Sequence, residues 1–387
     1  MKLPRIIRVF WLVSGLRGVS LMGIVHFIGA PRTFDVRGRP KRVVRIIVGD
    51  KRGNSVHVSI WNDSLISKVV EGVRRGSVIK ISGGTVRKTV KGVELMVSRG
   101  DIEIIGKESV GVLELEDGSK ANFTVFGKIV DVYKPLYDDG SYRTAVLLDT
   151  PEGIYRLLAL RHHQDDMKPG ALIEVDGTFL EVRKDMCGDV FLGVDSSVKI
   201  LEEEPITYSE LGVADVYKLL YSYGTAYVNV VGRLERVGGR FFLCGNMLCI
   251  PLYSRIEGTP PVGDVCLRGV FATRLSSGRP VIYFDKYSAI CEYKPVVERP
   301  VLINGESYYV KIAKLDELSI DLEKMGLSFT AFGYPFRAGS WLLERLLDIS
   351  SDIEEILIGS VLDCIWGPGG FRVRAFYGKD FKDVDRS

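Results

Sequence analysis

The chain has 387 residues, of which 46% are hydrophobic and 26% are charged, and its formal net charge is +3 at pH 7. This composition excludes a disordered or low-complexity protein and leaves room for about two to four domains, each with its own core. The first residues mimic a signal peptide, but Arg8 and Arg17 interrupt the apolar run, and no stretch is long enough for a transmembrane helix. We therefore expect a soluble, cytoplasmic and nucleoid-associated protein without a membrane partner.

The small net charge hides a strong asymmetry along the chain. Residues 1–100 hold 20 Lys/Arg and 5 Asp/Glu, whereas residues 101–204 hold 11 and 22. Affinity for a polyanion depends on the number of phosphates that cations can neutralise, so we expect it to concentrate in the first hundred residues. The acidic second block is a poorer host for phosphates.

Five short segments in the first hundred residues alternate apolar and polar side chains, as half-buried strands do. These segments are residues 20–28, 43–48, 56–61, 78–82 and 93–97. A helical pattern at residues 63–71 falls between the third and the fourth. Five strands with one helix in that place are the layout of an OB-fold, a small Greek-key barrel that holds oligonucleotides.

The same residues carry a more specific resemblance. The motifs are GLRGVSL at 15–21, Gly23-Ile24-Val25 in the first strand, SIWND at 59–63 and GSVIKI at 76–81. Together they resemble the single-stranded-DNA-binding domain of archaeal replication protein A. The resemblance implies a protein that coats single strands and has no enzymatic activity and no cofactor.

Two glycine landmarks of this first copy recur twice further along the chain. The glycine of the first strand recurs at nearly constant spacing, as Gly23, Gly127 and Gly232. The turn glycine before the fourth strand does the same, as Gly76, Gly170 and Gly263. The chain is thus predicted to be mostly β, with three tandem OB-fold barrels at residues 1–106, 107–204 and 205–294, the last preceded by a short helix.

Residues 295–387 have a different pattern, which predicts either an α+β unit or a degenerate fourth OB-fold. Strands are expected at 308–315 and 327–332, a helix at 316–325, and a closing hairpin around the GPGG motif at 367–370. Ser340 is expected to cap a helix at 341–349, and Ser351 with Asp352 to begin another. The leucine-rich helix and the acidic balance suit a protein partner, such as other OB-fold subunits, although a self-contained core explains them more simply.

Single strands are held by bases stacked on aromatic rings and by phosphates that pass along cations. In the first copy the candidate rings are Trp61, which ends the third strand, and Phe34, which lies in a basic hairpin. The alternatives are a tryptophan that closes the barrel mouth and a phenylalanine folded back on its own barrel. The candidate cations are Arg32, Arg37, Arg39, Lys41 and Arg42 around Phe34, and Arg87, Lys88 and Lys91 after the fourth strand.

The first copy departs from the resembling family at the end of the fourth strand. Thr85, Val86 and Val90 stand where close relatives carry aromatic residues. Two stacking rings are therefore missing, and we expect binding to depend on charge more than on stacking.

The third copy offers further candidates for contact with nucleic acid. These are Tyr253 and Phe271, with Arg255, Arg274 and Arg279 nearby. Phe179 of the second copy is the counterpart of Phe271. The alternation of the fourth strand puts both phenylalanines on the side of its buried residues, so core packing is an equally good interpretation. Tyr142 is expected to belong to a hairpin turn.

The six cysteines (Cys187, Cys244, Cys249, Cys266, Cys291 and Cys364) contain no CxxC pair. Buried free thiols are expected, and a zinc site built from Cys244, Cys249, Cys266 and Cys291 is the disfavoured alternative. His162-His163 with Asp165-Asp166 is the sole cluster that resembles a metal or acid–base site. Neighbouring side chains on a strand point to opposite faces, so we expect a solvated loop, no metal, and no enzyme.

These patterns predict a non-catalytic protein that binds single-stranded DNA in replication, repair or recombination. One alternative is a scaffold subunit of a larger DNA-processing complex, in which the later OB-folds bind proteins. The other is an RNA- or tRNA-binding protein, because OB-folds serve both nucleic acids. The single glutamine and six asparagines suggest a thermophilic source.

Overall fold

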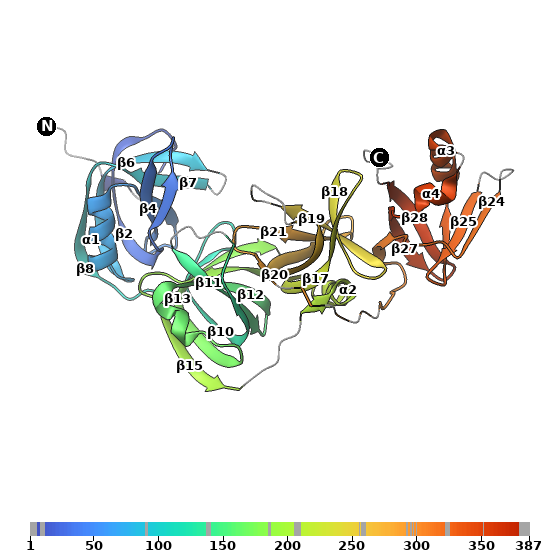
Figure 1. The fold of residues 1–387 in the computed structure, drawn as a ribbon. Helices are drawn as coiled ribbons and strands as arrows, with labels where there is room; N and C mark the ends of the chain where they lie inside the picture. Colours follow the sequence, from blue (N-terminus) through green and yellow to red (C-terminus); the bar gives the residue numbers. More distant parts are fainter. Residues whose placement is uncertain are drawn as a thin grey trace. The chain divides into compact units, whose positions relative to one another are not determined.

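The structure is a computed structural model that divides into two compact units, Met1–Tyr208 and Ser209–Ser387 (Figure 1). It describes residues 6–7, 12–89, 92–136, 141–184, 187–204, 210–254, 256, 261–291, 293–294, 296, 298, 300–321, 326–350 and 352–378. Within these ranges, every helix is too short or too polar to traverse a bilayer.

The first unit opens with a closed five-stranded barrel. Its strands are β2 (Arg17–Ile28), β4 (Pro40–Gly49), β5 (Ser55–Ile60), β6 (Ser77–Thr89) and β7 (Gly92–Val97). They pair in the order β2-β4-β5-β7-β6, and β6 pairs with β2 to close the barrel. Helix α1 (Asp63–Gly72) connects β5 to β6. This is the OB-fold order, so the five strands and the helix predicted from the sequence are confirmed.

Short strands extend this barrel, and a side-chain cap fixes its helix. The additional strands are β1 (Ile6–Ile7), β3 (Arg32–Asp35) and β8 (Asp101–Lys107). Helix α1 begins after Asn62, whose side-chain oxygen accepts hydrogen bonds from the backbone N–H groups of Ser64 and Leu65. Such a cap stabilises the first turn by about 1 kcal/mol, and it holds the chain directly after Trp61.

A second barrel of the same order completes the first unit. Its strands are β10 (Lys120–Tyr133), β11 (Tyr142–Thr150), β12 (Gly153–Leu160), β13 (Ala171–Lys184) and β14 (Cys187–Phe191). They pair as β10-β11-β12-β14-β13, with β13 returning to β10. Strands β9 (Leu113–Glu114) and β15 (Ser197–Glu203) flank the barrel. A 3-10 helix, η2 (Arg161–Asp166), stands where α1 stands in the first barrel, so the predicted loop at the two histidines is one short helix.

The second unit contains a third barrel with the same strand order. Its strands are β17 (Thr225–Val237), β18 (Arg240–Cys244), β19 (Leu248–Ser254), β20 (Gly263–Arg274) and β21 (Pro280–Phe284). They pair as β17-β18-β19-β21-β20, and β20 returns to β17. Strand β16 (Leu211–Gly212), the predicted helix α2 (Val213–Tyr223) and strand β22 (Ala289–Cys291) flank this barrel.

The last part of the chain follows the OB order with an interrupted first strand. Its strands are β23 (Ser307–Lys311), β24 (Glu317–Asp321), β25 (Gly326–Ala331), β26 (Tyr334–Ala338), β27 (Val361–Gly367) and β28 (Gly370–Tyr377). Strand β23 pairs with β27, as the start of an OB first strand pairs with strand four, and β24 pairs with β25, as its end pairs with strand two. Helices α3 (Ser340–Ile349) and α4 (Ile353–Leu357) lie between β26 and β27. Of the two predicted alternatives, the structure thus favours the degenerate OB-fold.

Two local predictions in this part are wrong. A helix is expected from the sequence at residues 316–325, but Glu317–Asp321 form strand β24, because Leu318 and Ile320 alternate with polar residues and the segment pairs with β25. Residues 322–325 fall outside the described residues. Ser340 is the first residue of α3 and not its cap, since Gly339 takes that position without a side-chain hydrogen bond. The start of α4 is confirmed, because the Asp352 side chain accepts a hydrogen bond from the Glu355 N–H.

The recurring glycines have the same physical role in each copy. A Cβ atom on Gly23, Gly127 or Gly232 would lie 2.5–2.8 Å from a backbone oxygen of the neighbouring strand. The turn glycines Gly76, Gly170 and Gly263 all have positive φ, which residues with a side chain rarely adopt. Both landmarks are therefore required by the barrel, which explains why they mark the repeat.

The expectation of free thiols is wrong for four of the cysteines. Cys244 is bonded to Cys249 and Cys266 to Cys291, which also removes the zinc alternative. Each pair is a set of directly opposed residues, Cys244 and Cys249 across the β18–β19 hairpin and Cys266 and Cys291 across β20–β22. Cys364 is a buried free thiol, as expected.

His26 is buried on β2. It lies beneath the segment that connects the first barrel to the second. Its ring and the side chain of Leu113 both lie against Gly49. Burial lowers the pKa of His26, and the nearby backbone of Gly111 opposes this only in part. The folded state therefore favours the neutral ring.

We predict that the first unit loses stability as the pH falls from 7 to 5. Because the folded pKa of His26 is below its usual 6.5, the unfolded chain binds the proton first, and stability declines as pH falls below about 6.5. Thermal unfolding at several pH values should show a shallower decline in His26→Gln than in the parent. The exposed His162→Gln variant is the control, and an identical pH profile for His26→Gln and the parent would contradict the prediction.

Candidate nucleic-acid interface

The outer surface of β4 and β5 is the part of the first barrel that brings the predicted rings together. Val44, Ile46 and Val48 of β4 point into the core, as do Val56, Val58 and Ile60 of β5. The residues between them therefore point outward. We call the outward set the β4–β5 face; it consists of the exposed Arg45, the half-buried His57 and Trp61, and Val43, Ile47 and Ser59, which other parts of the first unit cover.

Phe34 and Trp61 meet at one end of this face. Their ring centroids are 6.3 Å apart, and both residues are half-buried. The Trp61 backbone N–H donates to the Val97 carbonyl, and its indole Nε1 has no hydrogen-bond partner among the described residues. The hairpin that carries Phe34 turns at Arg37 and Gly38, both with positive φ. The two predicted rings thus form one surface instead of two separate ones.

Most of the predicted cations of the first barrel are exposed. Arg37, Arg39, Lys41 and Arg42 lie on the hairpin beside Phe34, and Arg87 and Lys88 lie on β6. Lys91 falls outside the described residues. Arg32 has a different environment, because its guanidinium lies 5.0 Å from the ring centre of Tyr142 and 5.5 Å from that of Phe191, both in the second barrel.

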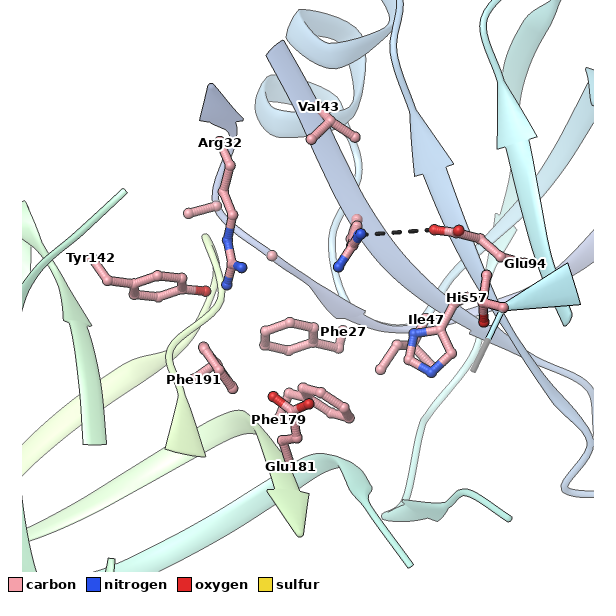
Figure 2. Close-up of a pocket in the computed structure, with 14 residues that line it drawn as sticks. Phe27, Arg32, Val43, Ile47, His57, Glu94, Tyr142, Phe179, Glu181 and Phe191 are labelled. Atoms are coloured by element: carbon pink, nitrogen blue, oxygen red, sulfur yellow. Dashed lines mark ion pairs between the residues drawn. The ribbon is translucent and has the colours of Figure 1, made fainter. Parts of the chain in front are cut away.

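The other end of the β4–β5 face opens into a cavity of about 280 Å³ between the two barrels of the first unit (Figure 2). Phe27, Arg45, His57 and Glu94 line it from the first barrel. The wall from the second barrel consists of Tyr142, Phe179, Glu181 and Phe191. We call this cavity the inter-barrel pocket. Figure 2 shows the phenylalanine rings gathered on one side, with His57 and Glu94 across from them.

The rings of the inter-barrel pocket are in mutual contact. The centroid of Phe179 lies 5.5 Å from that of Phe27, 6.2 Å from that of His57 and 6.2 Å from that of Phe191. On the polar side, Arg45 Nε and Glu94 Oε1 are 3.8 Å apart, and the Ser59 hydroxyl donates to Glu94. The pocket therefore combines aromatic faces with a cation and carboxylates.

The sequence placed Phe179 on the wrong side of its strand. Gly177 has a φ of +75°, the pairing of β10 with β13 shifts register nearby, and alternation resumes with Leu180 buried and Phe179 outward. Gly83 and Gly269 have positive φ at the equivalent point of β6 and β20. A glycine inside a strand signals such a bulge, and this signal could have corrected the prediction.

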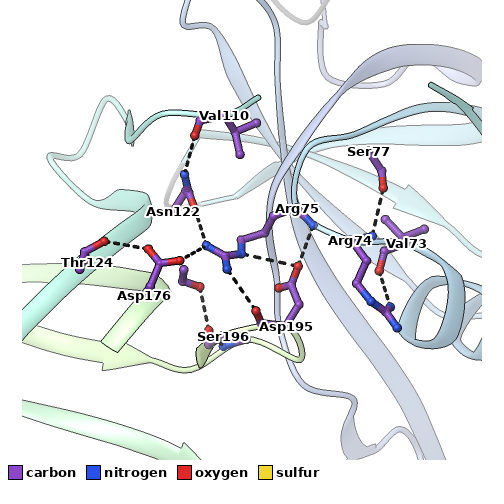
Figure 3. Close-up of polar contacts among 12 residues, drawn as sticks. Val73, Arg74, Arg75, Ser77, Val110, Asn122, Thr124, Asp176, Asp195 and Ser196 are labelled. Atoms are coloured by element: carbon purple, nitrogen blue, oxygen red, sulfur yellow. Dashed lines mark hydrogen bonds and ion pairs between the residues drawn. The ribbon is translucent and has the colours of Figure 1, made fainter. Parts of the chain in front are cut away.

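Arg75 joins the two barrels of the first unit through a group of polar contacts (Figure 3). Its Nη1 donates to Asn122 Oδ1 at 2.7 Å and to Asp176 Oδ2 at 2.9 Å, and its Nη2 donates to the Asp195 carbonyl at 3.2 Å. Its backbone N–H donates to Asp195 Oδ2 at 2.7 Å. The guanidinium lies directly against Gly177, where any Cβ atom would overlap it. We call these contacts the Arg75 clamp.

The charged groups of the Arg75 clamp favour the contact between the two barrels of the first unit. Burial alone would raise the pKa of Asp176, but hydrogen bonds from Thr124 and Arg75 outweigh it, so the pKa lies below its usual value. The chain also pairs directly across the junction, since the Val194 N–H donates to the Ile28 carbonyl at 2.9 Å. The second barrel, which the sequence marks as the poorer host for phosphates, forms one wall of the pocket.

In the third barrel the predicted rings differ in accessibility. Tyr253 is 43% exposed and lies 5.8 Å from Tyr283 in a stacked arrangement. Phe271 is only 5% exposed, between the rings of Tyr227 and Tyr283. Phe271 therefore offers no free face for a base, whereas Tyr253 does. Arg255 falls outside the described residues.

The predicted cations of the third barrel are engaged in ion pairs with the last barrel. Arg274 pairs with Glu306, and Arg279 lies 2.7 Å from Asp363 Oδ2. Asp363 is fully buried and also bonds Arg374 at 2.7 Å. These contacts join the two barrels of the second unit, so the geometry does not support Arg274 and Arg279 as phosphate ligands.

Comparison with known proteins finds similarity to solved structures alone. No family model matches the sequence, and no curated protein matches it. One similar solved structure is the replication factor A related protein from Methanobacterium thermoautotrophicum, with 27% identity, 26% of this chain and 91% of that chain covered, and a TM-score of 0.23. Another is the second OB-fold domain of replication protein A from Methanococcus maripaludis, with 20% identity, coverage of 25% and 91%, and a TM-score of 0.21.

A third similar structure is a replication protein A heterotrimer bound to single-stranded DNA, with 11% identity, 96% of this chain and 95% of that chain covered, and a TM-score of 0.33. All three TM-scores are low, so these likenesses carry no argument about function. The strand order given above defines the class by itself: this chain is a mostly β protein built of tandem OB-fold barrels.

We predict that Arg75→Ala loosens the first unit, whereas Arg74→Ala does not. Arg75 is 19% exposed, and its loss removes its ion pairs with Asp176 and Asp195, although Asp176 keeps the hydrogen bond from Thr124 and Asp195 keeps the one from the backbone N–H of residue 75. Because Asp176 is 45% exposed, the cost should be about 2 kcal/mol, below that of a fully buried pair. For a unit of this size the melting temperature should fall by about 4–8 °C. Arg74 is an exposed neighbour whose guanidinium bonds the carbonyls of Val70 and Val73 in the first barrel. Equal melting temperatures for the two variants in calorimetry would contradict the role of the clamp.

Proposed function

We propose that this chain binds single-stranded DNA without catalysis, as proteins of the replication protein A type do. The β4–β5 face of the first barrel is the principal site. The observation that carries the proposal is the contact between Phe34 and Trp61, at 6.3 Å, beside a hairpin with four exposed cations.

The chemistry of this arrangement suits an unpaired strand. Half-buried rings accept stacked bases only when those bases are free of a complementary strand, and stacking contributes about 1–3 kcal/mol per base. Arg39, Lys41 and Arg42 are close enough in the hairpin to accompany the phosphates of the same short segment. A duplex exposes phosphates but no base faces, so charge alone would hold it less tightly.

We predict that Trp61→Ala and Phe34→Ala each weaken binding of a fluorescent dT oligomer by about tenfold or more, since each removes a stacking surface. Anisotropy titrations of the full chain would measure the change. Tyr223→Ala is a matched control, because Tyr223 is a 71% exposed ring at the end of α2 and does not belong to the β4–β5 face. Unchanged affinity in both Trp61→Ala and Phe34→Ala would contradict the stacking of bases at this site.

We predict a steep dependence of this affinity on salt. Each phosphate contact to a single strand contributes about −0.7 to the slope of log K against log salt. The double variant Arg39→Gln/Arg42→Gln should therefore have a slope shallower by about 1.4, whereas Trp61→Ala should lower affinity with the slope nearly unchanged. Parallel titrations with a matched duplex and a matched RNA oligomer test the choice of nucleic acid, and tighter binding of either would contradict the proposal.

A second function, as a scaffold subunit of a larger DNA-processing complex, is favoured by the second unit. Arg274 and Arg279 are held by acidic groups of the last barrel, which leaves that unit with fewer cations for phosphates. Replacing Tyr253 and measuring DNA affinity separates the two roles. A tenfold loss of DNA affinity would show that the third barrel binds DNA. Unchanged DNA affinity would favour a role of the third barrel in protein contacts.

A further inference from the structure

Strand β15 (Ser197–Glu203) is a free edge of the second barrel. It stands at one end of the seven-stranded sheet and pairs with β13 on one side (Figure 1). Among the described residues, no strand pairs with its other side. Every residue of β15 except Val198 is exposed. Such an edge offers a row of backbone N–H and C=O groups with which a strand of another chain can pair.

The equivalent strands of the other two barrels are protected in different ways. In the first barrel, α1 lies beside β8: Lys68 Nζ is 3.0 Å from Asp101 Oδ1, and the side chain of Ile104 lies against Gly72. In the third barrel, the equivalent strand is β22, which has only three residues. The counterpart of α1 in the second barrel is the six-residue 3-10 helix η2. Strand β15 is therefore the edge that is both long and without a full α-helix beside it.

The middle of β15 exposes two neighbouring apolar side chains. Ile200 is 38% exposed and Leu201 is 41% exposed. Edge strands are commonly protected by a proline, a charge or a bulge. β15 contains no proline, and its bulge is confined to Leu201, where the register with β13 shifts by one residue. The remaining question is whether its charges repel or attract a second strand.

The charges of β15 are arranged to attract another copy of the same strand. Lys199 pairs with Glu174 of β13 and Glu202 pairs with Leu172, whereas Ile173 between these two is fully buried. Lys199 and Glu202 therefore both lie on the outer face of the sheet. Since directly opposed residues of antiparallel strands share a face, a pairing that opposes Lys199 to Glu202 of a second copy brings opposite charges together. Two-fold symmetry forms this contact twice.

The same register also matches the other residues of the strand. It opposes Ile200 to Leu201 of the second copy, so the exposed apolar side chains meet at the two-fold axis. It opposes Glu203 to Val198, so no two carboxylates face each other directly. Opposite charges across a strand pair stabilise it and like charges destabilise it. The strand is thus complementary to itself in charge and in apolar contact.

We propose that the partner of this edge is a second copy of this chain, and that the two copies associate through antiparallel β15 strands with Lys199 opposite Glu202. The interface is isologous, because both copies use the same residues. One strand from each copy forms a small interface, so the dimer is reversible and depends on protein concentration. This inference goes beyond the proposed binding of DNA and does not depend on it.

The experiment measures the self-association of the full chain by sedimentation velocity over a series of protein concentrations. The parent should convert from monomer to dimer as its concentration rises. Lys199→Glu and Glu202→Lys should each weaken the dimer about tenfold, since each replaces two attractive cross-strand pairs by two repulsive ones. The double variant Lys199→Glu/Glu202→Lys exchanges the two charges and should restore the dimer of the parent.

Lys134→Glu is the matched control, because Lys134 is an exposed lysine of the same barrel outside β15, and the variant changes the net charge equally. It should associate like the parent, and melting temperatures check that every variant is folded. A parent that remains monomeric at all concentrations overturns the proposal. So do single variants that associate like the parent, and a double variant that associates no better than the single ones.

Discussion

The first unit depends on one guanidinium in a place where two barrels meet. Arg75 forms hydrogen bonds with an amide, two aspartates and a backbone carbonyl at the junction. Groups of this kind cost free energy when they are left unsatisfied, so the docked arrangement is much better than a slightly displaced one. Tandem OB-folds are commonly pictured as separate modules on a string. Here two of them share a wall, and the Arg75 clamp, together with the Val194–Ile28 hydrogen bond, fixes the composite surface that they form.

Gly177 shows how closely backbone and side-chain requirements are linked at this junction. Its positive φ reverses the alternation of β13, so that Phe179 faces the pocket, and its missing Cβ admits Arg75. A residue with a side chain would disturb both at once. Gly83 and Gly269 form equivalent bulges, so a glycine with positive φ in the fourth strand is common to three copies. Among the described residues, it is Gly177 that also makes room for an arginine of the neighbouring barrel.

Much of the architecture could be predicted from the sequence, because barrels impose local requirements that residues reveal. Alternation gave the strands of the first copy, and the spacing of Gly23 and Gly76 revealed the repeat. The pair Phe34 and Trp61 was identified by residue type and position. What could not be predicted depends on neighbours far along the chain: Arg74 and Arg75 look alike in sequence, and only the fold shows which one meets Asp176. The disulfides depend likewise on which strands lie opposite each other.

In the second unit the third barrel does not end at its own last strand. β23 pairs with β19 through Leu248 and Cys249, so one sheet runs from the third barrel into the last. A polypeptide that stopped before Ser307 would leave this side of β19 as an uncovered row of amides and carbonyls, a surface that recruits other chains. Strand β23 therefore covers this part of β19, and a version of this protein that lacks β23 is expected to self-associate.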